Sequence, residues 1–193
     1  MQHRDRTVID PAWPDLGGNG RHGDIGTFCP RLWRYLVERF SIQSVLDVGC
    51  GEGHAVAFFR YMGLIAHGID GLPLNVKRAV TPIALHDIRN GPHIMPVDLV
   101  WSCEVAEHID EDKVDNYIKT LTNGKIIAMT HAEPGDPGHH HVNNQPREYW
   151  VEKLAAVGYD LDPYNEVYVT ISKRDEVESY FSRTGLVFHR MVD

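Results

Sequence analysis

The sequence has few cysteines, and they form no pattern. Cys29, Cys50 and Cys103 are the three cysteines among 193 residues, and no two of them make a C-x-x-C pair. An odd number without such pairs indicates free thiols rather than a disulfide framework. Free thiols are typical of a reducing compartment, so we expect a cytoplasmic protein.

Long hydrophobic runs are also missing. No window approaches the 18 apolar residues that a membrane-spanning helix needs. The first residues, Met1 to Arg6, lead into no apolar region, so we expect no secretory signal peptide. The length suits one soluble domain with a substantial core.

Positive charge is in the minority. The chain has 19 Lys and Arg against 27 Asp and Glu, a net charge of −8. A broad nucleic-acid-binding face usually shows as a basic patch. The composition therefore disfavours nucleic acid as a partner, without excluding a local phosphate site, and it fits a small-molecule substrate.

Glycines are concentrated in one stretch, SVLDVGCGEG at residues 44–53. Its apolar first half predicts a buried strand. Gly49, Gly51 and Gly53 follow Asp47 at alternate positions. Glycine is needed where the backbone takes a positive φ or where a ligand approaches the main chain closely. Three glycines in five residues, between a strand and a helix, predict a cofactor-binding loop.

The spacing of these glycines narrows the choice of cofactor. A dinucleotide fingerprint, G-x-G-x-x-G, would place its last glycine where His54 stands, and no P-loop motif occurs. A nicotinamide-dependent reductase therefore does not fit. About 20 residues further on, the predicted strand 64–70 ends in Asp70. Dinucleotide-binding domains place an acid at this position to hold ribose hydroxyls. The loop and the acid together predict a nucleoside-containing cofactor.

The pattern of strands and helices predicts the fold class. Alternation along the chain indicates a single-domain α/β fold of Rossmann-like type, with a mostly parallel sheet and helices on both faces. The domain is expected at 27–193, with Thr27 capping a helix that runs to Phe40, and residues 1–26 as a flexible segment or flap. Residues 164–182 fit either a strand or a helix. The expected strands are 44–48, 64–70, 81–85, 96–102, 125–130, 159–161 and 185–190.

The D-x-G-x-G-x-G stretch at 47–53, together with Asp70, resembles motif I of class I S-adenosylmethionine-dependent methyltransferases. The resemblance covers roughly residues 40–160. It implies the seven-stranded fold of that family, S-adenosyl-L-methionine as cofactor and S-adenosyl-L-homocysteine as product. Asp70 would accept the ribose hydroxyls and Asp87 the adenine amino group. The implied cofactor-binding residues lie at or near strand ends: Asp47, Gly49, Gly51, Asp70, Leu72, Asp87, Ile88 and Ser102.

A second motif, Glu104-Val-Ala-Glu107-His108, follows the fourth expected strand. On a helical turn Glu104, Glu107 and His108 would share one face. Carboxylates and an imidazole can bind Mg or Mn, and His140 from the loop after the fifth strand could complete the set. The motif looks like the metal motif of ubiquinone-biosynthesis O-methyltransferases and small-RNA terminal 2′-O-methyltransferases. In those families the ion lowers the pKa of the attacked hydroxyl.

Two other interpretations of these residues stay open. One of His108, His139 and His141 could act directly as a general base, because an imidazole accepts a hydroxyl proton near neutral pH. Alternatively, Glu107 and His108 cap the turn, and the loop histidines are solvated.

The sequence as a whole predicts a methyltransferase that acts on a hydroxyl of a small molecule or sugar. One alternative is an RNA 2′-O-methyltransferase. Another is a non-catalytic subunit that binds the cofactor and partners an active enzyme. The acceptor pocket is expected to come from residues 1–26, 131–149 and 164–182, which are mostly loops, where specificity usually resides.

Overall fold

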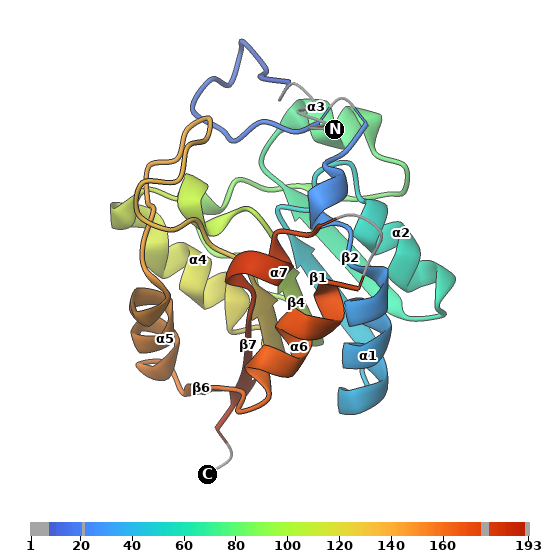
Figure 1. Ribbon diagram of the computed structural model, residues 1–193. Coiled ribbons are helices and arrows are strands. Elements are labelled where there is room, and N and C mark those ends of the chain that lie inside the picture. Colours follow the sequence, from blue (N-terminus) through green and yellow to red (C-terminus); the bar gives the residue numbers. More distant parts are fainter. Residues whose placement is uncertain (1–7, 21, 175–177, 192–193) are drawn as a thin grey trace.

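The computed structural model describes residues 8–20, 22–174 and 178–191 (Figure 1). Within them, seven strands form one sheet in the order β3-β2-β1-β4-β5-β7-β6. The first five strands pair in parallel, and β7 runs antiparallel to both of its neighbours. This confirms the predicted mostly parallel α/β sheet. The strands are β1 (Ser44–Val48), β2 (Ile65–Asp70), β3 (Ala84–Leu85), β4 (Val97–Ser102), β5 (Gly124–Met129), β6 (Tyr159–Leu161) and β7 (Leu186–Arg190).

Helices alternate with the strands along the chain. The α-helices are α1 (Pro30–Phe40), α2 (His54–Tyr61), α3 (Pro73–Arg78), α4 (Val114–Leu121), α5 (Arg147–Ala155), α6 (Asn165–Ser172) and α7 (Phe181–Thr184). The 3-10 turns are η1 (Ile25–Thr27), η2 (Ile88–Asn90), η3 (Ala106–His108) and η4 (Glu111–Lys113). No helix in the described ranges is both long and apolar enough to cross a membrane.

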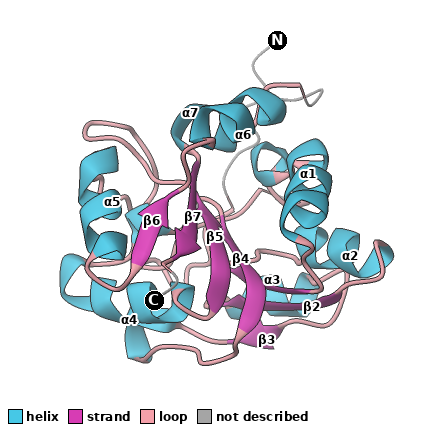
Figure 2. Cartoon of the chain, turned by 90° about the horizontal axis from the view of Figure 1, so that it is seen from below, coloured by secondary structure: helices cyan, strands magenta, loops and turns pink. Residues whose placement is uncertain are grey.

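The sheet separates two apolar layers. Alternate residues of each strand point to opposite faces, so Val45 and Leu46 of β1 belong to different core clusters. On one face the sheet packs against α4 and α5, through Tyr117 and Trp150. On the other face the sheet packs against α1, α2, α6 and α7 (Figure 2), through residues such as Trp33, Phe59 and Phe181. These two layers fix the carboxyl ends of the parallel strands at one rim.

Two local predictions were wrong, and one ambiguity is resolved. Thr27 does not cap the first helix, because Asp24 caps a separate 3-10 turn there and α1 starts at Pro30. Residues 164–182 fitted either a strand or a helix, and within this stretch Asn165–Ser172 is the helix α6. The expected third strand is also shorter, since only Ala84 and Leu85 pair with β2.

Candidate functional site

The loop between β1 and α2 has the backbone that its glycines allow. Gly49, Gly51 and Gly53 have φ of +69°, +55° and +80°. In this left-handed region a residue with a Cβ is strained. A Cβ on Gly49 would also collide with Val105. The loop therefore packs closely against its neighbours, and its Gly49 and Cys50 amides donate to the Ile69 carbonyl at 2.9 and 3.0 Å.

Asp70 ends β2 directly beside this loop. Its carboxylate accepts hydrogen bonds from the Gly51 amide at 2.8 Å, the Leu72 amide at 2.8 Å and the Asn75 side chain at 3.0 Å. Burial raises its pKa to about 6. A carboxylate has about four lone-pair positions, so three partners leave room for one more donor. Asp70 is thus held rigidly with capacity for a ligand hydroxyl.

Asp47 lies deeper, at the bottom of the same loop. It is buried, and its pKa is raised well above the ordinary value, by burial and then by the nearby charge of Asp70. It lines a cavity of about 590 Å³, within the range of small-ligand sites. A buried acid facing a cavity is suited to a cationic ligand group.

Asp87 is already engaged by a cation. Its carboxylate accepts from Arg89 Nε at 3.0 Å and Nη2 at 2.9 Å, and from the Arg89 amide at 3.0 Å. Leu72 and Ile88 are buried and line the cavity beside it. The expectation that Asp87 accepts an adenine amino group stays a prediction, and such a group would share this carboxylate with Arg89.

The cavity brings most of the predicted site residues together. Those that line it are Asp47, Gly49, Gly51, Asp70, Leu72, Asp87, Ile88, Glu104, His108, His139 and His141. Three predicted residues are not part of this lining: Ser102, Glu107 and His140. Ser102 is fully buried and bonded to Tyr117 and the Val48 carbonyl. It supports the strand ends from beneath rather than facing the cavity.

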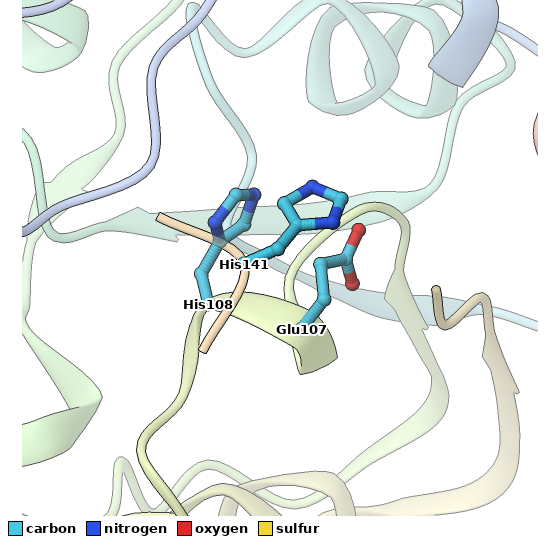
Figure 3. A group of neighbouring side chains, drawn as sticks. All are labelled: Glu107, His108 and His141. Atoms are coloured by element: carbon cyan, nitrogen blue, oxygen red, sulfur yellow. The ribbon is translucent and has the colours of Figure 1, made fainter. Parts of the chain in front are cut away.

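A group of possible metal ligands lies next to the cavity. Glu107, His108 and His141 each offer a ligand atom, and these atoms lie within 4.8 Å of one another. Figure 3 shows the three side chains converging, two from η3 and one from the loop after β5. Both carboxylate oxygens of Glu107 and Nδ1 of His141 are buried without a hydrogen-bond partner in the described chain. Buried polar atoms are normally satisfied, so these orphaned donor atoms fit a bound cation.

The ring orientation of His108 also suits a ligand. Its Nδ1 lies 3.1 Å from the His140 carbonyl, which can accept the ring N–H. Metal-binding histidines commonly donate their second nitrogen in this way, which fixes the tautomer. The structure therefore brings the side chain of His141 to this group. Of the predicted ligand His140, only the backbone carbonyl contacts the group.

Glu104 belongs to the site by a different geometry from the one expected. Its φ is +59°, and the 3-10 turn starts only at Ala106, so the prediction of one continuous helical face was wrong. Thr130 holds it by accepting its amide hydrogen at 2.8 Å and donating to its carboxylate at 3.1 Å. This turn keeps Glu104 near Glu107, and burial together with the Glu107 charge raises the pKa of Glu104.

Protonation states in this region follow from burial. Burial lowers the pKa of His108 to about 4 and also lowers that of His141. Burial raises the pKa of Glu107 to about 7. Both histidines are therefore neutral at pH 7, which is the form that binds metal. His139 is half-buried, and its Nε2 lies 3.1 Å from the Pro14 carbonyl.

Sequence reasoning missed two residues of this site. Arg183 from α7 lines the cavity and pairs with Asp136 at 2.9 Å. Asn75 orients Asp70. Arg183 lay in a stretch without a clear pattern, and only its charge could have drawn attention to it. Asn75 follows Asp70 by five residues, and its polar side chain on a short helix was the available signal.

No protein-family model and no curated protein matches this sequence. Solved structures match its fold. The sugar N-methyltransferase KedS8 from Streptoalloteichus sp. ATCC 53650 superposes with a TM-score of 0.65 at 16% identity, covering 100% of this chain and 99% of that one. The methyltransferase domain of bacterial CtHen1-C gives 0.58 at 20% identity, with 84% and 98% covered. The [4+2]-cyclase SpnF gives 0.57 at 16%, with 92% and 88% covered.

These likenesses, together with the strand order and the antiparallel β7, identify the fold. The chain has the Rossmann-like fold of class I S-adenosylmethionine-dependent methyltransferases. At such identities the comparison concerns the fold alone. Activity has to be argued from the site.

Proposed function

We propose that the protein is an S-adenosylmethionine-dependent methyltransferase that methylates a hydroxyl of a small molecule or sugar with the help of a divalent metal. One observation carries the proposal. The glycine loop with Asp70 and the Glu107–His108–His141 group flank a single cavity, so a methyl donor and a metal-bound hydroxyl could meet there.

The glycine loop, Asp47, Asp70 and Asp87, called the cofactor half of the site from here on, fit S-adenosylmethionine. Asp70 would receive a ribose hydroxyl, Gly49 and Gly51 line the cavity without a side chain, and Asp47 suits the ammonium of the amino-acid moiety. When bound, this cofactor supplies an electrophilic methyl group on a sulfonium. The chain's own contribution is alignment of that group with the acceptor, and positioning accounts for about 7–11 kcal/mol of many barriers.

The group of Glu104, Glu107, His108 and His141, called the metal half of the site from here on, fits Mg or Mn. Glu107, His108 and His141 would hold the ion, with Glu104 beside them. The ion would act as a Lewis acid that lowers the pKa of an acceptor hydroxyl. Direct base catalysis by His108 is less well supported, because an imidazole with a pKa of about 4 is a weak proton acceptor at pH 7.

Two features favour a small acceptor. Residues 16–19 of the N-terminal segment line the cavity and limit its size, and the chain is acidic overall. The E-x-x-E-H motif, which resembles that of small-RNA terminal 2′-O-methyltransferases, keeps an RNA 2′-hydroxyl as the second candidate. The similarly folded SpnF is a [4+2]-cyclase, so methyl transfer by this protein must itself be measured.

The first experiment is calorimetric titration with S-adenosylhomocysteine. We expect micromolar binding by the parent protein and a loss of at least about tenfold in Asp70→Asn, because an amide NH₂ replaces an acceptor oxygen. Asp160→Asn, at an exposed position of β6, is the matched control. Absence of binding by the parent would refute the proposed cofactor.

The second experiment is manganese titration followed by electron paramagnetic resonance on chelator-treated protein. Binding should be lost in His108→Ala and His141→Ala and kept in His67→Ala, which changes an exposed histidine of β2. Labelled cofactor is then offered with vicinal diols, catechols, sugars and an RNA 3′ end. Transfer to RNA alone would select the second candidate. Cofactor binding without transfer to any acceptor would favour a non-catalytic subunit.

A further inference from the structure

Residues 8–20, called the lid from here on, form a closed loop above the cavity. Val8 and Asn19 pair as an antiparallel bridge, with N–H···O distances of 2.7 and 3.3 Å. Between them Asp10 accepts from the Ala12 amide at 3.0 Å and from the Trp13 amide at 2.9 Å. A loop whose ends are paired in this way moves as a unit. In Figure 1 it lies, in blue, at the same end of the molecule as the orange loop 131–145.

The lid is bonded through intermediate side chains to two acids of the cofactor half, Asp87 and Asp70. Arg89 holds Asp87 with Nε and Nη2, and its Nη1 bonds the carboxylate and the carbonyl of Asp15, each at 3.0 Å. Asn19 donates to Asn75 at 3.3 Å, and Asn75 donates to Asp70. The lid therefore reaches Asp87 and Asp70 by two separate routes.

The same loop touches the metal half. Gly17 lies against the imidazole of His108, so closely that a Cβ built on Gly17 would be 3.0 Å from the ring. The Pro14 carbonyl lies 3.1 Å from Nε2 of His139. The lid thus connects the cofactor half with the ligand group across the cavity.

We propose that the lid couples the two halves of the site, with Arg89 as the positioning residue that holds it closed. A ligand beneath the lid gains contacts to it only in the closed state, and therefore shifts the equilibrium toward closure. Closure sets Gly17 against His108. The cofactor therefore binds first, and the lid that closes over it completes the metal half before the acceptor binds. This coupling rests on the proposed function, whereas the Arg89 contact stands independently of it.

Hydrogen–deuterium exchange of the full chain tests both parts. Peptides from residues 8–20 are compared with a β4 peptide as internal reference, with and without saturating S-adenosylhomocysteine. Asp15→Asn removes the charge from the lid contact and leaves the Asp87–Arg89 pair intact, whereas Arg89→Gln removes both the lid contact and the pair. Arg78→Gln, an exposed arginine at the end of α3, is the control.

We expect lid exchange about two- to fivefold faster in Asp15→Asn without ligand, the range for a partly exposed ion pair. Arg89→Gln should exchange faster still, and Arg78→Gln should match the parent. Ligand should slow exchange in the parent lid and less so in Arg89→Gln. Unchanged exchange in both variants would overturn the role of Arg89. Ligand binding seen by calorimetry without slower lid exchange would overturn the coupling. Failure of the ligand to bind would refute the proposed function, while the ligand-free variants would still decide the Arg89 contact.

Discussion

Replacing Glu107 with glutamine should stabilise the metal-free protein while removing metal binding. Glu107 is fully buried, both its oxygens lack hydrogen-bond partners in the described chain, and Glu104 lies beside it. A buried carboxylate in this position opposes folding whenever it is ionised. Glutamine keeps the shape and removes the charge.

The magnitude follows from the pKa of Glu107, which burial raises from 4.5 to about 7. Each pKa unit corresponds to about 1.4 kcal/mol. Below pH 4.5 Glu107 is protonated in both the folded and the unfolded state, so its burial carries no penalty. As the pH rises from 4.5 to about 7, the unfolded state loses this proton first and the folded protein becomes less stable. Above that pH the parent protein carries a penalty of about 3 kcal/mol. Glu107→Gln should be more stable than the parent by this amount at pH 8 and by less at pH 5.

Urea denaturation with chelator present, at pH 5 and pH 8, measures this difference. Glu152→Gln, at an exposed position of α5, should unfold like the parent at both pH values. Manganese at 100 times its Kd should raise the parent's stability by about 2.7 kcal/mol and leave the variant unchanged. A variant less stable than the parent at pH 8, or one stabilised equally by manganese, would refute the reasoning.

Three further predictions concern the same cavity. Gly17→Ala should weaken manganese binding in paramagnetic resonance and spare S-adenosylhomocysteine affinity, because its Cβ displaces the His108 ring; unchanged manganese affinity would contradict the contact. Gly51→Ala should lower the unfolding free energy by about 1–2 kcal/mol and weaken cofactor binding in calorimetry, since its φ is +55° and its Cβ would lie 2.9 Å from Asn19; parent-like values would contradict this. Manganese affinity should rise with pH up to about 7 and then level off as Glu107 loses its proton; a flat profile would count against Glu107 as a ligand.

The sheet could be predicted because its signals are local. Apolar runs ending in Asp47 or Asp70 fix both a strand and its carboxyl end. The ambiguity of the sequence over α6 has a physical cause. Its buried positions are Asn165, Tyr168, Val169 and Ser172, which have helical spacing. Polar side chains at two of these four positions hid the helical period, while the β-branched residues between them imitated a strand.

The site was predictable only where a motif is contiguous. Glu107 and His108 follow directly from the sequence, but three consecutive histidines carry no signal that separates His141 from His140. The choice depends on the backbone of the loop, where His140 has a φ of +53°. The contact between Asp15 and Arg89 joins residues 74 positions apart, and no pattern of spacing encodes such a pair.

Charge balance connects the two halves of the site. Four acids with raised pKa values, Asp47, Asp70, Glu104 and Glu107, lie in or beside one cavity, and within the described chain none of them forms an ion pair with lysine or arginine. Buried charges are normally paired. A cofactor with a sulfonium and an ammonium would supply positive charge near Asp47, and a divalent cation would supply it near Glu107. The cofactor and the cation together would thus balance the charge of both sets of acids. Stabilisation of the protein by the two ligands together should be greatest at high pH, where all four acids are ionised.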